Sequence, residues 1–316
     1  MKASDIIDLM NQWACPHLID EWDNTGFQLG DLEKEINKII VALDLDREVL
    51  EETLKEEAQM IITHHPLMFK PIKALRKQNY KEKLIMDLIK EDIVVYNAHT
   101  NLDLAINGVN DALANILNLK NCQVLKVTHE EPLYKFAVFV PKSHASRIRQ
   151  VLGNEGAGFI GTYSHCTYNV EGIGTFMPLE GTSPYIGEMN KLEEVEEIRI
   201  ETIVKKKDLK RVVKEVLDNH PYEEVAYDIY PLENKGQVFG YGRIGEVEKV
   251  KLKDYLDFIK RQLKVDNLIV YGDLEKEISK VAVCGGSGAT FIHDAYIKGA
   301  DVYITGDIKY HDSQYA

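Results

Sequence analysis

The chain has 316 residues, of which 45% are hydrophobic, so it is long enough to bury a full core in two domains or in one elaborated domain. Its formal net charge of −13 disfavours binding to a nucleic-acid backbone, which requires a basic face to displace counterions. The four cysteines are far apart and form no CxxC pair, so they indicate neither a disulfide framework nor a cysteine zinc site. A reducing, cytoplasmic location is therefore expected. The N-terminal residues lack the hydrophobic core of a signal peptide, and no hydrophobic run reaches membrane-spanning length.

Predicted helices and strands alternate in the first part of the chain. Hydrophobic residues at helical spacing predict an amphipathic helix over residues 4–14. The loop WDNTGFQLGD at 22–31 is rich in turn residues, and it is interpreted equally well as a surface loop or as the wall of a pocket. Strands are then predicted at 38–43, 60–63 and 93–97, with helices at about 47–57, at about 79–91 and after a cap at Asn107. This alternation predicts an α/β fold in which helices cover a parallel or mixed sheet.

The pattern changes between about residues 130 and 235. A strand at 134–140, a helix at about 143–152, a hairpin near 163–168, a strand at about 196–204, a helix at 209–216 and a strand at 225–229 follow one another. This order predicts a ferredoxin-like α+β domain. Because strand and helix alternate again after Gly240, we divide the chain into a core part at 1–129, an inserted domain at 130–235 and a second core part at 236–316. His220 closes the second helix of the insert and is interpreted as structural.

The last part of the chain contains a glycine-rich loop. A helix is predicted at about 252–264, a strand near Leu268–Tyr271, and a further strand that enters the sequence VCGGSGA at 283–289. A helix at about 289–298 and a strand at 301–306 follow. Such a loop at a helix N-terminus can bind an anion through its backbone N–H groups. The loop lacks the Walker lysine and the full dinucleotide spacing, so a plain tight turn is an equal alternative.

Histidines follow two neighbouring strands of the predicted sheet. His64 and His65 come after the strand at 60–63, and His99 and Asp103 come after the next one. If these strands are parallel neighbours, all four side chains gather at one edge, where open α/β sheets place their ligands. Adjacent strand residues point to opposite faces, so the two adjacent histidines suit two ions, which a carboxylate such as Asp103 can bridge. Imidazole and carboxylate without thiolate favour zinc, iron or manganese over calcium. His99 is assigned to orienting one of the metal-binding side chains rather than binding the metal itself.

Several motifs in order resemble a known family. They are WDNxGxQxGD at 22–31, THHP at 63–66, AHTNLD at 98–103, VCGGSGA at 283–289 and TGDxKYHD at 305–312. Together they resemble the Nif-three-like family, which is catalogued in many bacteria as GTP cyclohydrolase 1 type 2. The insert, with HPYEE at 220–224, resembles the domain similar to the nitrogen-signalling and copper-tolerance trimers that many bacterial members carry.

The resemblance implies a ring-shaped homohexamer with a dinuclear metal site that faces a central cavity. Carried over by motif, His64, His65 and Asp103 are ligands of two divalent ions, with zinc the first choice and iron or manganese the alternatives. The resemblance also implies a His-x-x-x-Glu near the C-terminus, whereas this sequence stops at Ala316. We therefore expect that the natural chain continues and brings a further His and Glu to the same edge.

Two functions are compatible with these features. The first is a metal-dependent hydrolase that opens the imidazole ring of a purine nucleotide such as GTP, although nothing in the residues themselves selects guanine and no catalytic residue is assigned. The second is a metal-binding ring assembly without turnover, whose inserted domain senses a small molecule or gates the ring. In both cases the expected partners are further copies of the chain and a small molecule, with no nucleic acid and no membrane.

Overall fold

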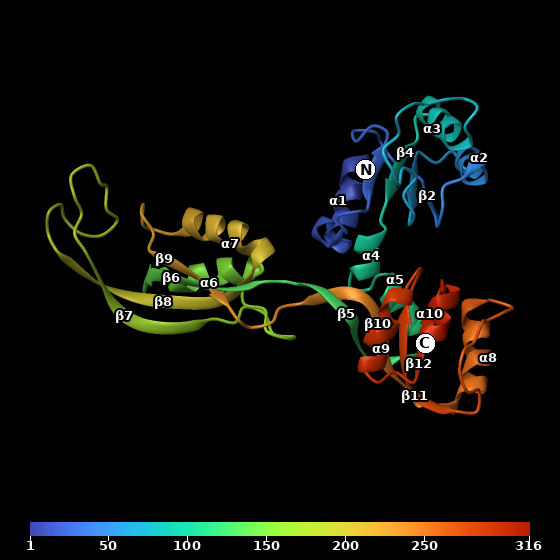
Figure 1. Cartoon of the computed structure of the whole chain (residues 1–316). Helices are drawn as coiled ribbons and strands as arrows, with labels where there is room; N and C mark the ends of the chain where they lie inside the picture. Colours follow the sequence, from blue (N-terminus) through green and yellow to red (C-terminus); the bar gives the residue numbers. More distant parts are fainter. The chain divides into compact units, whose positions relative to one another are not determined.

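The structure is a computed structural model that describes residues 1–316, and it divides into two compact units. Unit 1 comprises Met1–His129 and Phe239–Ala316, and unit 2 comprises Glu130–Val238. Strands β5 (Lys120–Glu130) and β10 (Val238–Lys251) lead the chain from one unit into the other (Figure 1). Each unit has its own sheets and its own hydrophobic core, so each is described by itself.

The N-terminal sheet of unit 1 has the strand order β1-β4-β3-β2. Its strands are β1 (Gly26–Leu29), β2 (Ile39–Ala42), β3 (Met60–Thr63) and β4 (Val94–Asn97). Strands β2, β3 and β4 run parallel, whereas β1 pairs with β4 in the antiparallel sense, so the sheet is mixed as predicted. Thr63 lies opposite Asn97 in the parallel register. The segments that follow these two strands therefore leave the sheet at the same edge.

Helices cover both faces of this sheet. Helix α1 (Ala3–Trp13) packs against Met60 and Val94 on one face, and α2 (Arg47–Lys55) and α3 (Tyr80–Lys90) pack against Ile61 on the other. Because β3 and β4 are buried on both faces, their residues form nearly continuous hydrophobic runs. Asp46 and Asn79 cap α2 and α3 by accepting a backbone N–H three residues later.

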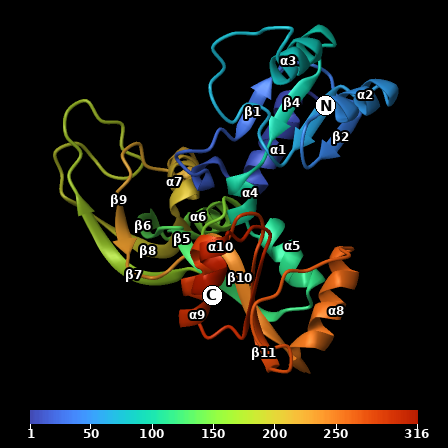
Figure 2. The same cartoon turned by 45° about the vertical axis from the view of Figure 1, so that its right-hand side comes forward.

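The C-terminal sheet of unit 1 has the order β12-β11-β10-β5. Strand β11 (Glu277–Cys284) pairs with β10 in the antiparallel sense and with β12 (Val302–Thr305) in the parallel sense. Helices α5 (Val109–Ile116) and α8 (Leu252–Leu263) pack on one side of this sheet, and α9 (Ile292–Ile297) packs on the other (Figure 2). The remaining short elements of this unit are η1 (Pro16–Leu18), α4 (Thr100–Leu104), η2 (Ala289–Phe291) and α10 (Tyr310–Tyr315).

Two local predictions for unit 1 are wrong. Residues 268–271 form no strand, and Ile269 is 86% exposed, because this hydrophobic stretch is not paired into either sheet. Asn107 does not cap α5 either: the N-cap is Gly108. Asn107 instead adopts a left-handed φ of 57° and donates its backbone N–H to the Asp111 carboxylate, 2.7 Å away.

Unit 2 contains a four-stranded antiparallel sheet with the order β7-β8-β6-β9. Its elements in chain order are β6 (Leu133–Pro141), α6 (Ala145–Asn154), β7 (Tyr168–Phe176), β8 (Glu193–Lys205), α7 (Lys206–Asn219) and β9 (Tyr227–Leu232). The strands and helices follow one another as predicted except at the hairpin expected near 163–168, where the structure has only an isolated bridge between Ile160 and Tyr163 before the single strand β7. The classification as ferredoxin-like stays a prediction. Both helices pack on one face of the sheet, where Val138 and Ile200 contact Ile148 and Val212 (Figure 1). The opposite face of the sheet carries no helix.

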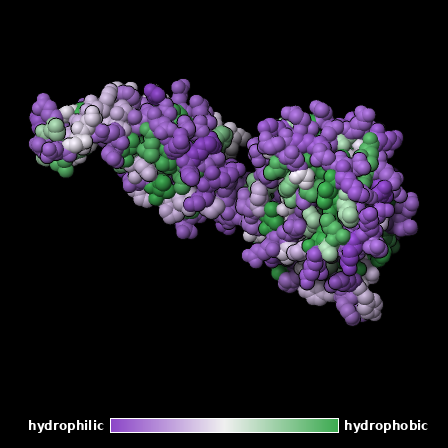
Figure 3. Space-filling view, turned by 90° about the horizontal axis from the view of Figure 1, so that it is seen from above, coloured by the Kyte–Doolittle hydropathy of each residue, from purple (hydrophilic) through white to green (hydrophobic).

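The surface mixes polar and hydrophobic groups. In the view of Figure 3, hydrophilic residues predominate on both units, and hydrophobic residues are interspersed among them. None of the helices combines the length and the hydrophobicity required to cross a bilayer.

Candidate metal centre

Three histidines gather at the edge of the N-terminal sheet where β3 and β4 end. His64 and His65 directly follow β3, and His99 is the N-cap of α4, just after β4. One ring nitrogen from each histidine lies within 4.8 Å of the other two. The ring centroid of His64 lies 5.1 Å from the centroid of His65 and 5.1 Å from that of His99. The centroids of His65 and His99 are 5.6 Å apart. We call these three side chains the imidazole cluster.

Strand geometry predicted that the two adjacent histidines point to opposite faces, and this prediction is wrong. The reason is that β3 ends at Thr63, so His64 and His65 lie in a bend rather than in an extended strand. The Thr63 hydroxyl donates to the backbone carbonyl of His65 across 2.8 Å and stabilises this bend. Both imidazoles therefore face the same cluster, and strand alternation gives no reason to assign them to different ions.

Each ring of the cluster is oriented by an oxygen at its Nδ1 atom. Nδ1 of His64 lies 2.9 Å from the Ala98 carbonyl, and Nδ1 of His65 lies 2.8 Å from Oδ1 of Asp44. Nδ1 of His99 lies 3.0 Å from Oδ1 of Asp23. A carbonyl or carboxylate oxygen only accepts, so Nδ1 carries a proton in each ring, and in the neutral imidazole the lone pair is then on Nε2. This is the arrangement by which proteins fix imidazoles as metal ligands.

Among these orienting groups, Asp23 is held in place by the largest number of hydrogen bonds. Its side chain is fully buried, with 0% of its surface exposed. Its Oδ2 atom accepts from the hydroxyls of Thr25 and Thr100, at 2.5 and 2.7 Å, and from the backbone N–H of Thr100 at 3.2 Å. Burial alone would raise the pKa of Asp23, but the hydrogen bonds from Thr25, His99 and Thr100 outweigh it and lower that pKa. Asp23 therefore stays ionised beneath the imidazole cluster.

The loop that carries Asp23 forms part of the site wall. The Trp22 ring contacts the ring of His99 edge-on at 6.0 Å and the ring of Phe69 at 5.9 Å. The loop therefore lies against the imidazole cluster, while Trp22 itself remains 59% exposed. Sequence reasoning gave Asp23 no role of its own, because an aspartate in a turn-rich segment is ordinary and its approach to His99 depends on the path of the loop.

Asp103 lies beside the cluster on α4. Its Oδ1 atom is 3.7 Å from Nε2 of His64, and 18% of its side chain is exposed. Burial raises the pKa of Asp103 to about 7, and the neighbouring carboxylates of Asp23 and Asp20 contribute to this rise. Negative charge is thus concentrated where the free Nε2 atom of His64 points. A cation at this position would relieve the repulsion.

His64 is held in its neutral form. Burial is the main cause of its lowered pKa, and the neighbouring rings of His99 and His65 lower that pKa further, against the hydrogen bond to the Ala98 carbonyl. Neutral imidazole is the form that binds metal ions. The donor set of the cluster therefore fits a divalent transition metal: neutral imidazole nitrogens beside a carboxylate, with no thiolate.

The C-terminal sheet supports the segment that carries His99 and Asp103. Arg243 on β10 is 5% exposed, and its guanidinium binds the Asp111 carboxylate in a bidentate pair, the Nη2–Oδ2 distance being 2.9 Å. The same guanidinium donates to the backbone carbonyl of Ala105 at 3.3 Å, directly after α4. The side chain of Asn110 donates to the carbonyl of Asp103 at 2.9 Å. These contacts fix α4, and hence the position of its carboxylate.

The glycine loop and His220 lie outside the imidazole cluster. The backbone N–H groups of Gly285 and Gly288 donate to side-chain oxygens of Asn110 and Thr305, each at 2.9 Å, so both are used inside the protein. The helix that follows is a 3-10 turn and the six-residue α9. The structure therefore favours the tight turn over an anion site. Both ring nitrogens of His220 make hydrogen bonds to the backbone of unit 2, which agrees with a structural role.

Fold and site together define a mixed α/β protein with an imidazole cluster at the carboxyl edge of a parallel strand pair. A family model described as Duf34/NIF3 (NGG1p interacting factor 3) matches residues 1–316. The chain therefore belongs to the DUF34/NIF3 family, as the motifs indicated.

Relatives and solved structures agree with this assignment. A protein of Bacillus subtilis named GTP cyclohydrolase 1 type 2 homolog is 44% identical over 312 residues, which is 98% of this chain and 84% of the relative. A relative of the same name from Halalkalibacterium halodurans is 44% identical over 311 residues, with the same coverage of both chains. The crystal structure of a Bacillus cereus protein related to NIF3 has a TM-score of 0.94 and 45% identity, and the match covers 100% of this chain and 85% of that one. A Staphylococcus aureus protein has a TM-score of 0.77 and 29% identity, and the match covers 100% and 84%.

Proposed function

We propose that this chain is a dinuclear metal-dependent hydrolase whose metal ligands include His64, His65 and Asp103. The observation that carries the proposal is the imidazole cluster, in which each ring has its Nδ1 atom against an oxygen and its Nε2 atom free. We extend the ligand set to His99, because its ring nitrogen lies within the same 4.8 Å as those of the other two histidines. Zinc is the first choice of metal, and iron and manganese are the alternatives.

The proposed substrate is a purine nucleotide, and GTP is the first candidate. This choice is supported by the printed name of the relatives, GTP cyclohydrolase 1 type 2 homolog. In the proposed reaction one water adds to C8 of the guanine, the imidazole ring opens, and a second water releases C8 as formate. Bound divalent ions supply Lewis-acid polarisation and water activation to such a step. The oriented imidazoles would hold such ions, and the ring of Trp22 lies between those of His99 and Phe69, in contact with both.

Formate release tests the enzymatic proposal. The protein is loaded separately with zinc, iron and manganese, incubated with GTP and assayed for formate. We expect release that is lost in His64→Ala and kept in His293→Ala, since His293 is exposed and lies outside the imidazole cluster. If no first-row metal supports formate release, the assignment of GTP as the substrate is wrong.

The alternative function is a metal-binding assembly without turnover, whose inserted domain senses a ligand or gates the ring. The observation that favours it is unit 2 itself, because the imidazole cluster is built entirely from unit 1. Deleting about residues 130–235 separates the two functions. A simple hydrolase keeps its metal and its formate release after this deletion, whereas a gated assembly changes its response to added solutes.

We also propose that the chain forms a homohexamer in the cytoplasm. The adjacent residues Tyr296 and Ile297 on α9 support self-association, since their large hydrophobic side chains are 78% and 68% exposed. Light scattering after size exclusion tests this proposal. A hexamer gives six times the chain mass of 36.0 kDa, and a single species at the chain mass contradicts it.

A further inference from the structure

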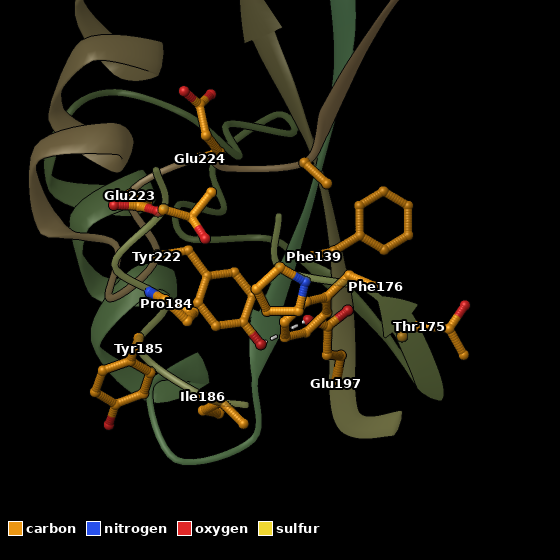
Figure 4. Close-up of a pocket in the computed structure, with 14 residues that line it drawn as sticks. Phe139, Thr175, Phe176, Pro184, Tyr185, Ile186, Glu197, Tyr222, Glu223 and Glu224 are labelled. Carbon is orange, nitrogen blue, oxygen red and sulfur yellow. Dashed lines mark hydrogen bonds between the residues drawn. The ribbon is translucent and has the colours of Figure 1, made fainter. Parts of the chain in front are cut away.

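A cavity lies in unit 2, well apart in sequence from the imidazole cluster. Its volume is about 420 Å³, which falls in the range of sites for small organic molecules. Its lining comes from β6, from β7 and the loop after it, from β8, and from the segment that precedes β9 (Figure 4). Phe139 and Glu197 belong to this lining, whereas their strand neighbours Val138 and Ile198 pack against the helices. The cavity therefore lies on the face of the sheet that α6 and α7 leave uncovered.

Aromatic rings form much of the cavity wall. Tyr222 is central, and its ring centroid lies 6.0 Å from that of Phe176 and 6.4 Å from that of Tyr185 (Figure 4). Phe139 adds a further ring from β6. The rings meet at interplanar angles of 51–61° rather than stacking flat. The negative faces of such rings attract cations.

Carboxylates complete the lining. Oε1 of Glu197 accepts the Tyr222 hydroxyl at 2.9 Å, and Oε1 of Glu223 accepts the backbone N–H of Ser183 at 2.9 Å. Glu224 also lines the cavity, and no lysine or arginine does. Burial and the Glu197 carboxylate raise the pKa of Tyr222, so its hydroxyl stays protonated and donates to Glu197.

Gly174 makes room for the Glu197 carboxylate. Glu197 on β8 is paired with Gly172 on β7, and its side chain leans along the same face over Gly174. A Cβ atom at Gly174 would lie 2.2 Å from Oε2 of Glu197, whereas a Cβ atom at Gly172 would meet nothing within 4 Å. The absence of a side chain at Gly174 therefore leaves the space that the Glu197 carboxylate occupies, whereas Gly172 has no such effect.

We propose that this cavity binds a small organic cation, namely an ammonium group carried on a hydrophobic body. Aromatic faces and the carboxylates of Glu197 and Glu223 favour positive charge, and the same carboxylates repel an anion. A bare metal ion is disfavoured, because these carboxylates are not among the side chains whose ligand atoms converge on one point. The volume and the aromatic walls suit an organic body in addition to its charge.

Calorimetric titration of the whole protein at pH 8 with three probes tests this proposal. The probes are benzyltrimethylammonium, its neutral isostere neopentylbenzene, and the anion phenylacetate. At this pH the ring of His220, whose pKa is lowered by burial, is neutral and adds no competing charge. We expect one benzyltrimethylammonium per chain, bound at least about tenfold more tightly than either other probe.

Two alanine variants on β7 locate the site. Gly174→Ala displaces the flexible end of Glu197, and we expect it to weaken binding of the cation about fivefold to tenfold. Gly172→Ala on the same strand is the matched control, and we expect it to bind like the unmodified protein. Tyr222→Leu removes the central ring and should weaken binding by a similar factor, and circular dichroism checks that each variant is folded.

Three results would overturn the proposal. The first is equal binding of the cation and its neutral isostere, which would make the cavity merely hydrophobic. The second is tighter binding of phenylacetate than of the cation. The third is the absence of heat from benzyltrimethylammonium at millimolar concentration. The three-probe comparison uses the unmodified protein, so it decides the matter even if a variant fails to fold.

Discussion

Replacing Asp23 by asparagine should weaken metal binding without disturbing the fold. In the structure Oδ2 of Asp23 accepts three hydrogen bonds from Thr25 and Thr100, while Oδ1 faces only Nδ1 of His99. An asparagine keeps its oxygen where three donors point, so its NH2 group must take the place of Oδ1. That group donates to Nδ1 of His99, and the ring proton then moves to Nε2. His99 would thus present an N–H to the metal site instead of a lone pair.

The size of the effect follows from the role of the lost contact. Outer partners of metal-binding histidines typically contribute a factor of about 10 to 100 in metal affinity, or about 1.4 to 2.8 kcal/mol. The upper part of that range is expected for Asp23, because its side chain is fully buried and no water can replace it. The melting temperature of the metal-free protein should change little, since the hydrogen bonds from Thr25 and Thr100 remain.

Competition with a chromophoric zinc chelator measures the affinity. Asp44→Asn is the matched control, because Asp44 contacts Nδ1 of His65 in the same way at 2.8 Å. The side chains of Asp44 and His65 are 65% and 46% exposed, so water can replace the lost contact and the loss should stay below about threefold. Equal zinc affinity in Asp23→Asn and the unmodified protein would refute the reasoning about the His99 ring.

Three further predictions concern stability, each checked by thermal or urea unfolding of the metal-free protein. Asp103→Asn should stabilise it more at pH 8 than at pH 5, by about 3 kcal/mol. The folded-state pKa of about 7 exceeds the ordinary 3.8, so the ionised side chain destabilises the fold progressively as pH rises from about 4 to 7, and equal stabilisation at both pH values would contradict this. Asp111→Ala should cost about 3 to 5 kcal/mol by leaving the buried Arg243 unpaired, and a loss below 1 kcal/mol would contradict it. Gly30→Ala should lower the free energy of unfolding by about 1 to 3 kcal/mol more than Gly26→Ala. Both glycines have positive φ, but only at Gly30 would a Cβ atom meet backbone, at 2.7 Å from the Cα atom of Val94, and equal losses would show that this close approach is unimportant.

The helices could be predicted well because their hydrophobic stripes repeat with the helical period. The stripes placed α1 and α3 within a few residues of their observed bounds, and the charged segment at about 47–57 likewise matches α2. Strands β5 and β10 were harder. Most residues of β5 are exposed, so it lacks a hydrophobic run, and β10 contains Gly240 and Gly245, which are typical of loops. The structure shows why these glycines are needed: a Cβ atom at either would collide with a backbone carbonyl of β5.

The position of the histidines could be predicted from the sheet, whereas their orientation could not. Parallel neighbours end at one edge, so residues after β3 and β4 had to come together. The bend at His64 depends on where β3 stops, and element boundaries are the least predictable feature of a sequence. The contacts of Asp23 and Asp44 with the rings depend on the three-dimensional path of two loops. The cavity of unit 2 likewise joins four segments that are distant in sequence.

Anomalous diffraction from zinc-soaked crystals of the protein tests the central claim most directly. The proposed site predicts zinc peaks at the imidazole cluster, about 2.0–2.1 Å from ring nitrogens of His64 and His65. A dinuclear centre predicts two such peaks about 3.5–4 Å apart, with Asp103 beside both. Zinc found only at other histidines, such as His311, or no peak at the cluster when zinc is saturating, would contradict the account.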